Sequence, residues 1–306
     1  MQILVVGGSG FIGRHLVAHL VAEGYFVSVP TRRYANGRAL LPLPTVTLHQ
    51  IDAHQEEALA PLVKRADVVV NLVGILHSRN GSPWGADFDK AHVQLPEMLA
   101  RLCCQYDVTH FIHVSALGVS AQAPSAYLRS KAEGESRIQN VFHSANNSKW
   151  TIFRPSVVFG PDDRFLNLFA QLARCLPVLF IAGAQSRLQP VYVGDVVKAL
   201  YEVMGKTQHF GQIYDLAGPE VYTLAELVER AARWGGHPRR VIGLPTGLGY
   251  AQALFLEKLP GQPLMSRDNL ESLKVDNVSA TPMPPALDII PTPLEAVAPR
   301  YLAWWR

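Results

Sequence analysis

The sequence predicts an α/β fold built on a doubly wound parallel sheet, and three observations predict it. A short aliphatic strand, Gln2–Val6, leads directly into a glycine-rich turn. Strand and helix patterns then alternate through the first half of the chain, which is typical of a parallel sheet with right-handed crossovers. With 306 residues, 48% of them hydrophobic, the chain has room for one large domain and a smaller lobe.

The first strand and the turn after it predict a nucleotide-binding site. The strand is typical of one covered on both faces, and Phe11 to Val21 carries apolar residues at helical spacing. At such a junction glycines let the backbone turn sharply and let a pyrophosphate approach, while the helix N-terminus offers free N–H groups. The turn therefore predicts a Rossmann-type dinucleotide site, the alternative being a turn that serves packing only.

The glycines fit two spacings. Gly8, Gly10 and Gly13 fit GxGxxG, whereas Gly7, Gly10 and Gly13 fit GxxGxxG. The second spacing is typical of short-chain dehydrogenase/reductases, particularly the extended, epimerase-like branch. The turn alone does not choose between them.

Alternation continues to about residue 160 and then fades. Further strands are predicted at Phe26–Val29, Val46–Gln50, Val68–Val73, His110–Val114 and Trp150–Phe153, and helices at Ala58–Lys64, Asp87–Tyr106 and Ala126–Phe142. Later helices are predicted at Val191–Met204, at Thr223–Trp234, which a capping box of Thr223 and Glu226 opens, and at Gly247–Leu259, which is amphipathic. We expect a dinucleotide-binding domain over 1–160, with elements to about 220 contributing, and a smaller C-terminal α/β lobe for substrate or partner over 161–306.

Composition excludes several classes of protein. The 28 basic and 25 acidic residues give a net charge of only +3, and they are scattered, so we expect no nucleic-acid partner. No apolar run approaches the roughly 18 residues of a transmembrane helix. The chain shows no signal or transit segment, and its three cysteines and eleven histidines lack metal-ligand spacing, which predicts a cytoplasmic protein without a metal site.

The end of the second strand favours NADP(H) over NAD(H). NAD sites place a carboxylate there, about 20 residues beyond the glycines, but no Asp or Glu occurs between Gly24 and Ile51. Arg32 and Arg33 stand there instead, and a guanidinium holds a 2′-phosphate by charge-assisted hydrogen bonds. The alternative places both arginines on an exposed loop. Asp52 is expected either to receive the adenine amino group or to form a simple turn or cap.

A tyrosine and a lysine follow the fifth strand at helical spacing. Tyr127 and Lys131 are four residues apart and share one helix face. In that geometry the lysine lowers the pKa of the phenol and holds the nicotinamide ribose, while the phenol exchanges the proton that accompanies hydride transfer. The alternative is an exposed helix face. Gly74, after the fourth strand, is expected to allow close approach of the cofactor.

Several motifs together carry a family resemblance. GGSGFIG, NLVG, HVSALG, YLRSK, RPSVVFGPDD, QPVYVGDVVKAL and MSRDNLESLKVDN resemble extended short-chain dehydrogenase/reductases of the atypical branch. They are most similar to bacterial relatives of the complex I accessory subunit known as alpha subcomplex subunit 9. The resemblance implies that Pro155, Ser156 and Val157 back the nicotinamide and that Asp195 starts a helix, where a capping role is favoured over a catalytic one. The complete set expected to contact the cofactor is Gly7, Ser9, Gly10, Phe11, Ile12, Gly13, Arg32, Arg33, Asp52, Leu72, Val73, Gly74, Val114, Tyr127, Lys131, Pro155, Ser156 and Val157.

One departure from the family pattern bears on activity. Active extended members carry a Ser or Thr at the end of the fifth strand, and here that position is Ala116. Ser115 is adjacent and is the candidate third catalytic residue beside Tyr127 and Lys131, although neighbouring strand residues point to opposite faces. Ser120 and Ser125 are alternative hydroxyls.

Two function classes follow from these residues. The first is an NADP(H)-binding accessory or cofactor-sensing protein of a respiratory or membrane-associated complex, at the inner face of a membrane. The second is a working reductase, dehydrogenase or epimerase that takes a small carbonyl or hydroxyl substrate. Two segments could contact a partner or a membrane, or could instead pack within the lobe. They are the apolar helix Gly247–Leu259 and the C-terminal residues Tyr301, Leu302, Trp304 and Trp305.

Overall fold

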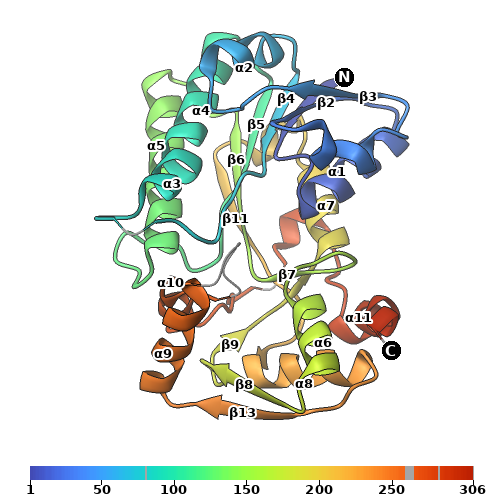
Figure 1. Cartoon of the computed structure of the whole chain (residues 1–306). Helices are drawn as coiled ribbons and strands as arrows, with labels where there is room; N and C mark the ends of the chain where they lie inside the picture. The colour runs from blue at the N-terminus through green and yellow to red at the C-terminus, as the bar shows by residue number, and fades with distance from the viewer. Residues whose placement is uncertain (80, 259–264, 282, 306) are drawn as a thin grey trace.

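The computed structural model describes the chain except residues 80, 259–264, 282 and 306. Its centre is a seven-stranded sheet in which every neighbouring pair is parallel, with the order β11-β6-β5-β4-β1-β2-β3 (Figure 1). These strands are β1 (Gln2–Val6), β2 (Phe26–Thr31), β3 (Val46–Gln50), β4 (Val68–Asn71), β5 (His110–Val114), β6 (Trp150–Pro155) and β11 (Gln212–Leu216). The predicted doubly wound parallel sheet is confirmed.

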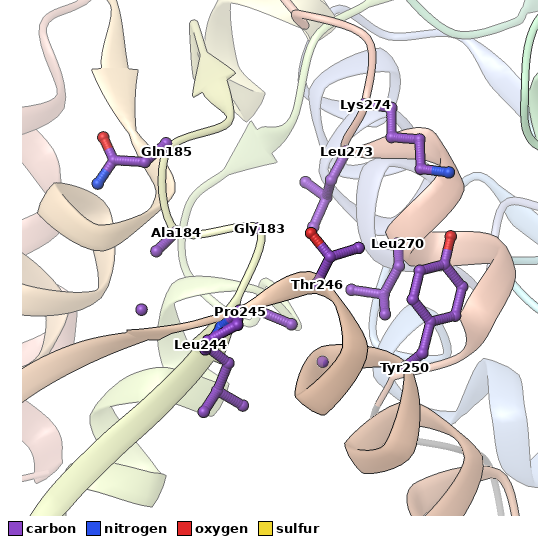
Figure 2. Close-up of a pocket in the computed structure, with 13 residues that line it drawn as sticks. Gly183, Ala184, Gln185, Leu244, Pro245, Thr246, Tyr250, Leu270, Leu273 and Lys274 are labelled. Carbon is purple, nitrogen blue, oxygen red and sulfur yellow. The ribbon is translucent and has the colours of Figure 1, made fainter.

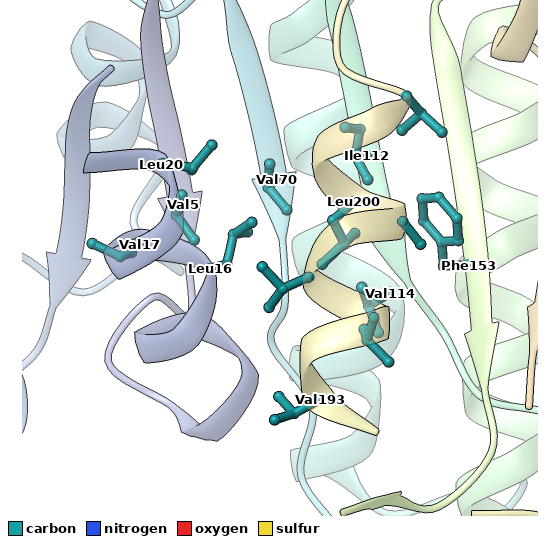
Figure 3. Packing of buried hydrophobic residues seen from close by; sticks show 14 of the residues in the cluster. Val5, Leu16, Val17, Leu20, Val70, Ile112, Val114, Phe153, Val193 and Leu200 are labelled. Atoms are coloured by element: carbon teal, nitrogen blue, oxygen red, sulfur yellow. The ribbon is translucent and has the colours of Figure 1, made fainter. Parts of the chain in front are cut away.

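Helices cover both faces of this sheet. One face carries α1 (Phe11–Ala22) and α7 (Val193–Glu202), and Figure 3 shows Leu16 of α1 and Leu200 of α7 directed toward the strand residues Val70 and Ile112. The other face carries α2 (Glu56–Val63), α4 (Leu95–Gln105) and α5 (Ala126–Ser144). Short 3-10 helices lie at Tyr34–Leu40, Thr207–His209, Pro285–Leu287 and Ala303–Trp305.

The winding direction changes between β1 and β4. From β1 the chain builds β2 and β3 on one side, and from β4 it builds β5, β6 and β11 on the other. In open parallel sheets ligands bind outside the carboxyl ends of the strands at such a switch point. The glycine turn follows β1 at this point.

The C-terminal lobe is smaller and has its own apolar core, in which α6 (Leu166–Cys175), α8 (Leu224–Trp234) and α11 (Leu294–Leu302) pack together. It occupies the lower half of Figure 1. Its strands are β7 (Val158–Phe159), β8 (Val178–Ala182), β9 (Arg187–Leu188), β10 (Val191–Tyr192), β12 (Tyr222–Thr223) and β13 (Arg240–Leu244). Its helices also include α9 (Thr246–Glu257) and α10 (Arg267–Ser272). The capping box of Thr223 and Glu226 is confirmed at the start of α8.

The helix predicted over Asp87–Tyr106 is interrupted. It consists of α3 (Ala86–Phe88), a π-helical segment at Asp89–Gln94, and α4. Pro96 has no N–H to donate to the carbonyl of His92, four residues before it, and its ring crowds that carbonyl. The freed carbonyl lies against Gly134 of α5, where a Cβ would be 1.9 Å from it. Pro96 and Gly134 thus place His92 beside α5.

Two predictions in the later part of the chain are wrong. Asp195 does not cap α7, because it lies inside the first turn and its carboxylate accepts hydrogen bonds from the backbone N and Oγ1 of Thr292, at 2.6 and 2.9 Å. The helix predicted as amphipathic at Gly247–Leu259, whose last residue is outside the described ones, is apolar on both faces. In α9, Gly249 and Ala253 are buried, while Leu248 and Phe255 are exposed.

Some of the apolar and aromatic side chains at the C-terminus are packed against the lobe, and one is exposed. Leu302 is fully buried, and Tyr301 and Trp305 donate hydrogen bonds to Asp163 and Asn167, at 2.7 and 2.8 Å. Trp304, in contrast, is 86% exposed. Among the described residues, no helix combines the length and apolar character that crossing a bilayer needs.

Candidate functional site

The glycine turn is shaped by close backbone contacts. Gly7 has a φ of +87°, and a Cβ there would lie 3.0 Å from the carbonyl carbon of Leu72, at the end of β4. A Cβ on Gly13 would lie 2.4 Å from the Gly7 oxygen, and Gly10 is the N-cap of α1. The turn therefore brings the α1 N-terminus, with its free N–H groups, against the ends of β1 and β4.

Both glycine spacings have a structural reason. Gly8 belongs only to GxGxxG, and its Cβ would lie 2.9 Å from Val29 Cγ1. Gly7 belongs only to GxxGxxG and takes the left-handed backbone conformation that glycine favours. The sharp turn is thus at Gly7, in the longer spacing. Ser9, Phe11 and Ile12, also predicted at the cofactor, are half-buried along this turn.

The adenosine end of the predicted site is polar and basic. Arg32 and Arg33 follow β2 and are exposed. His54 lies nearby, and its pKa is lowered first by burial and also by the positive charges of Lys90 and Arg32, against the opposing effect of Asp52. Asp52 forms a turn, since its Oδ1 accepts the His54 N–H at 3.1 Å. The ends of β2 and β3 thus present two guanidinium groups.

The predicted Tyr127–Lys131 pair lies on α5 at the ends of β4 and β5. Lys131 is 3% exposed, and its Nζ donates to the carbonyl of Val114 at 2.9 Å and to that of Val73 at 3.4 Å. A Cβ on Gly74 would lie 3.6 Å from the same nitrogen. The structure therefore gathers Lys131 with three residues predicted at the nicotinamide.

The pKa values of this pair differ from what the spacing alone predicts. Burial lowers the pKa of Lys131 to about 8, an effect that the Glu135 carboxylate opposes. Burial raises the pKa of Tyr127 to about 12. The expected lowering of the phenol pKa by the lysine is therefore not found. At neutral pH the phenol keeps its proton and is a hydrogen-bond donor.

The residues after β5 contribute an apolar side chain to the cluster against which Tyr127 packs. Tyr127 packs against a small cluster that contains Ala116 and Leu128. Ser115 is buried, and its Oγ has no hydrogen-bond partner among the described residues. Both alternative hydroxyls already take part in local hydrogen bonds, because Ser125 Oγ accepts the Leu128 N–H at the N-cap of α5 and Ser120 Oγ donates to Gln122.

Two buried histidines lie close enough to Lys131 for its charge to affect their pKa values, and the sequence did not predict them. His92 Nε2 accepts the Ile75 N–H at 3.1 Å, its Nδ1 is 2.9 Å from Ser130 Oγ, and its ring meets that of Tyr127 edge-on. His113 Nδ1 is 3.1 Å from the Asn71 side-chain nitrogen. Burial, and then the charge of Lys131, hold the pKa of both histidines well below the usual range. Both are neutral at physiological pH.

A distant segment also holds the site together. The Asp268 carboxylate, from α10, accepts the N–H groups of Ala126 and Tyr127 at 2.7 and 3.0 Å. Asn277 Oδ1 accepts the Ser156 hydroxyl at 2.5 Å and the Val157 N–H at 3.1 Å. Both residues belong to the MSRDNLESLKVDN motif, which was the available signal for them. Pro155, Ser156 and Val157 thus lie at the end of β6, anchored by Asn277.

Residues 3–217 match the family model described as "NAD dependent epimerase/dehydratase family". The chain belongs to this family. It is an extended short-chain dehydrogenase/reductase, and the resemblance drawn from its motifs is confirmed. The glycine cradle and the buried Lys131 fit the dinucleotide that the family description names.

Relatives within the family carry different names. The chain is 33% identical over 302 residues to the NADH dehydrogenase (ubiquinone) 1 alpha subcomplex subunit 9 of Mus musculus, covering 95% of this chain and 77% of that protein. It is 30% identical over 246 residues to the ceramide reductase of Caulobacter vibrioides, covering 79% and 73%. The UDP-glucose 4-epimerase of Thermus thermophilus in complex with NAD has the same fold, with a TM-score of 0.69, 21% identity and 99% coverage of both chains.

Proposed function

We propose that this chain binds NADP(H) and serves as an accessory or cofactor-sensing protein of a respiratory complex. The observation that carries the proposal is the apolar contact of Tyr127 with a cluster that contains Ala116, where active extended members place a hydroxyl. Loss of one such donor commonly costs a factor of 100 to 1000 in rate, on the order of 3–4 kcal/mol. The mouse relative, named as a subunit of NADH dehydrogenase, supports the accessory role.

NADP(H) is favoured by the charge at the end of β2. Arg32 and Arg33 are exposed there, with no carboxylate on that strand or the loop after it. An exposed guanidinium is free to turn toward a 2′-phosphate, whereas the NAD ribose is normally held by an acidic side chain. The α1 N-terminus would hold the pyrophosphate, and Lys131 the nicotinamide ribose.

A titration with both cofactors tests this preference. We expect the wild-type protein to bind NADPH more tightly than NADH. Arg32→Ala should weaken the affinity for NADPH about tenfold, since a charge-assisted hydrogen bond is lost, and should leave the affinity for NADH unchanged. Quenching of protein fluorescence measures both affinities. Arg38→Ala, an exposed arginine on the following 3-10 helix, is the control and should change neither. Equal affinity for the two cofactors would overturn the preference.

The second candidate is an active reductase, dehydrogenase or epimerase, with Tyr127, Lys131 and Ser115 as catalytic residues. The buried Lys131 and the protonated Tyr127 favour it, and so does the relative named ceramide reductase. The bound dinucleotide would supply the hydride. Tyr127 would donate the proton to a small carbonyl substrate, and Lys131 would position the ribose.

A substrate panel separates the two candidates. Carbonyl compounds and nucleotide sugars should be assayed with wild type and with Tyr127→Phe. Turnover that Tyr127→Phe abolishes would make the protein an enzyme. Inactivity of both proteins, with NADPH still bound, is the result that the accessory role predicts. Co-purification with a respiratory complex at the inner face of the membrane would identify the partner.

A further inference from the structure

The C-terminal lobe contains a pocket that the cofactor site does not use. It has a volume of about 420 Å³ and lies between the loop after β8, the start of α9, and α10 (Figure 2). That volume is within the range of about 300–1,000 Å³ that is usual for small-molecule sites. None of its lining residues belongs to the set predicted to contact the dinucleotide.

The walls of this pocket are apolar. Nine of the 13 lining residues are glycine, alanine, leucine or proline. Figure 2 shows Leu270 of α10 and Leu273, which directly follows that helix, on one side and Leu244, at the end of β13, on the other. A Cβ on Gly249 would lie 2.8 Å from that of Ala182, so α9 packs directly against β8. Binding of a hydrocarbon chain against such a lining is favourable, because it removes apolar surface from water.

The charged groups at the pocket are paired with one another. Among the described residues that line the pocket, Lys274 alone has a cationic side chain, and its Nζ donates to both carboxylate oxygens of Glu271, at 2.8 and 2.9 Å. The Tyr250 hydroxyl donates to the same carboxylate. The nearby Arg267 is likewise paired, with Glu257 at 3.0 Å. Within the part of the lining that the structure describes, a diphosphate would therefore meet no unpaired cation.

We propose that this pocket binds the hydrocarbon part of an amphipathic ligand with an uncharged head. The aliphatic lining receives the chain, while Thr246 is a lining residue whose hydroxyl is able to hydrogen-bond a hydroxyl or carbonyl head. The same helix, α9, exposes Leu248 and Phe255 on its opposite face, so apolar surface continues outside the pocket. This inference extends the proposed function and does not depend on cofactor binding.

A series of linear alcohols from 1-butanol to 1-decanol tests the proposal by calorimetric titration. Each added methylene should tighten binding about fourfold until the pocket is filled. Thr246→Trp places an indole in the pocket from an exposed position and should weaken 1-decanol at least tenfold, by occupying the volume it needs. Leu248→Trp, on the outward face of the same helix, is the matched control and should bind 1-decanol like wild type.

Three results would overturn the proposal: no dependence on chain length, equal binding by Thr246→Trp and wild type, or displacement of 1-decanol by UDP-glucose. Incubation with phosphatidylcholine vesicles that contain diacylglycerol then distinguishes the sources of the chain. Diacylglycerol retained by the re-isolated protein assigns a bilayer lipid with an uncharged head, 1-decanol binding without lipid retention assigns a free amphiphile, and retention of phosphatidylcholine in preference to diacylglycerol would overturn the uncharged head. Failure to bind either dinucleotide would remove the proposed function, while the alcohol series would still decide the pocket.

Discussion

The residues around Lys131 form a buried cluster of ionisable groups. Lys131, His92 and His113 are all nearly inaccessible, and burial lowers the pKa of each. Glu135, one turn further along α5, is 2% exposed and is held by Arg154 through paired hydrogen bonds. Clusters whose pKa values are shifted by burial are concentrated at functional sites. The cluster lies at the ends of β4 and β5, where the nicotinamide is predicted.

The buried lysine predicts a dependence of stability on pH. Because the pKa of Lys131 falls from 10.5 to about 8 on folding, the unfolded chain binds more protons between these values. The free energy of unfolding should therefore rise with pH from about 8 toward 10, by up to about 3 kcal/mol. Lys131→Met should remove this rise, as measured by urea unfolding at successive pH values.

The control for that measurement is an exposed lysine on the other face of the sheet. Lys198→Met, on α7, should retain the wild-type pH dependence. The rise of the unfolding free energy with pH should end near pH 10, because Tyr127 has the opposite effect. Its pKa is raised on folding, so its contribution to stability is lost as pH rises from about 10 to about 12. Identical profiles for Lys131→Met and wild type would contradict the prediction.

Local spacing was enough to predict some of these residues and not others. Tyr127 and Lys131 lie on one helix beside a strand that the sequence already indicates, so their pairing was predictable. His92 and Asp268 act across the fold, 38 residues from Ser130 and 141 from Tyr127. A hydrogen bond between residues so far apart in the chain leaves no periodic signal in the sequence.

Among the elements, the β1–turn–α1 unit was predicted closely, because backbone conformation and packing both require its glycines. A Cβ on Gly13 would lie 2.4 Å from the Gly7 oxygen, and backbone atoms cannot yield like a flexible side chain. Gly13→Ala should therefore destabilise the protein by about 1–3 kcal/mol and abolish tight NADPH binding. Urea unfolding and cofactor titration measure the two effects.

A second glycine provides the matched control for Gly13. Gly247, in the first turn of α9, has nothing within 4 Å of its Cβ direction. Gly247→Ala should leave stability unchanged or raise it by up to about 1 kcal/mol, because alanine favours the helix. Comparable losses in the two variants would show that the Gly13 contact is not the cause.

The elements that departed from prediction did so for reasons of tertiary packing. The π-helical segment depends on Pro96 meeting Gly134 of another helix, a contact that helical periodicity does not report. The helix α9 has apolar residues on both faces because one face lines the pocket while Leu248 and Phe255 are exposed on the other. Its periodicity alone therefore does not identify which face is covered.

At the scale of the whole molecule, residues 265–277 connect the two lobes. Asp268, at the start of α10, holds the N-terminus of α5, and Asn277 holds the loop after β6. Between them, Leu270 and Leu273 line the pocket. One short segment thus touches the hydrocarbon pocket and both edges of the predicted nicotinamide site. A ligand that orders this segment has a direct physical route to the cofactor site.

This connection predicts coupling between the two sites. Saturating 1-decanol should tighten NADPH binding about fivefold, the lower end of usual allosteric couplings, because it holds α10 and thereby Tyr127 in place. By thermodynamic linkage, bound NADPH should raise the affinity for 1-decanol by the same factor. Asp268→Ala should abolish the coupling while both ligands still bind, whereas Asp276→Ala, an exposed carboxylate paired with Arg187, should preserve it. Undiminished coupling in Asp268→Ala, measured by titrating each ligand in the presence of the other, would show that the sites communicate by another route.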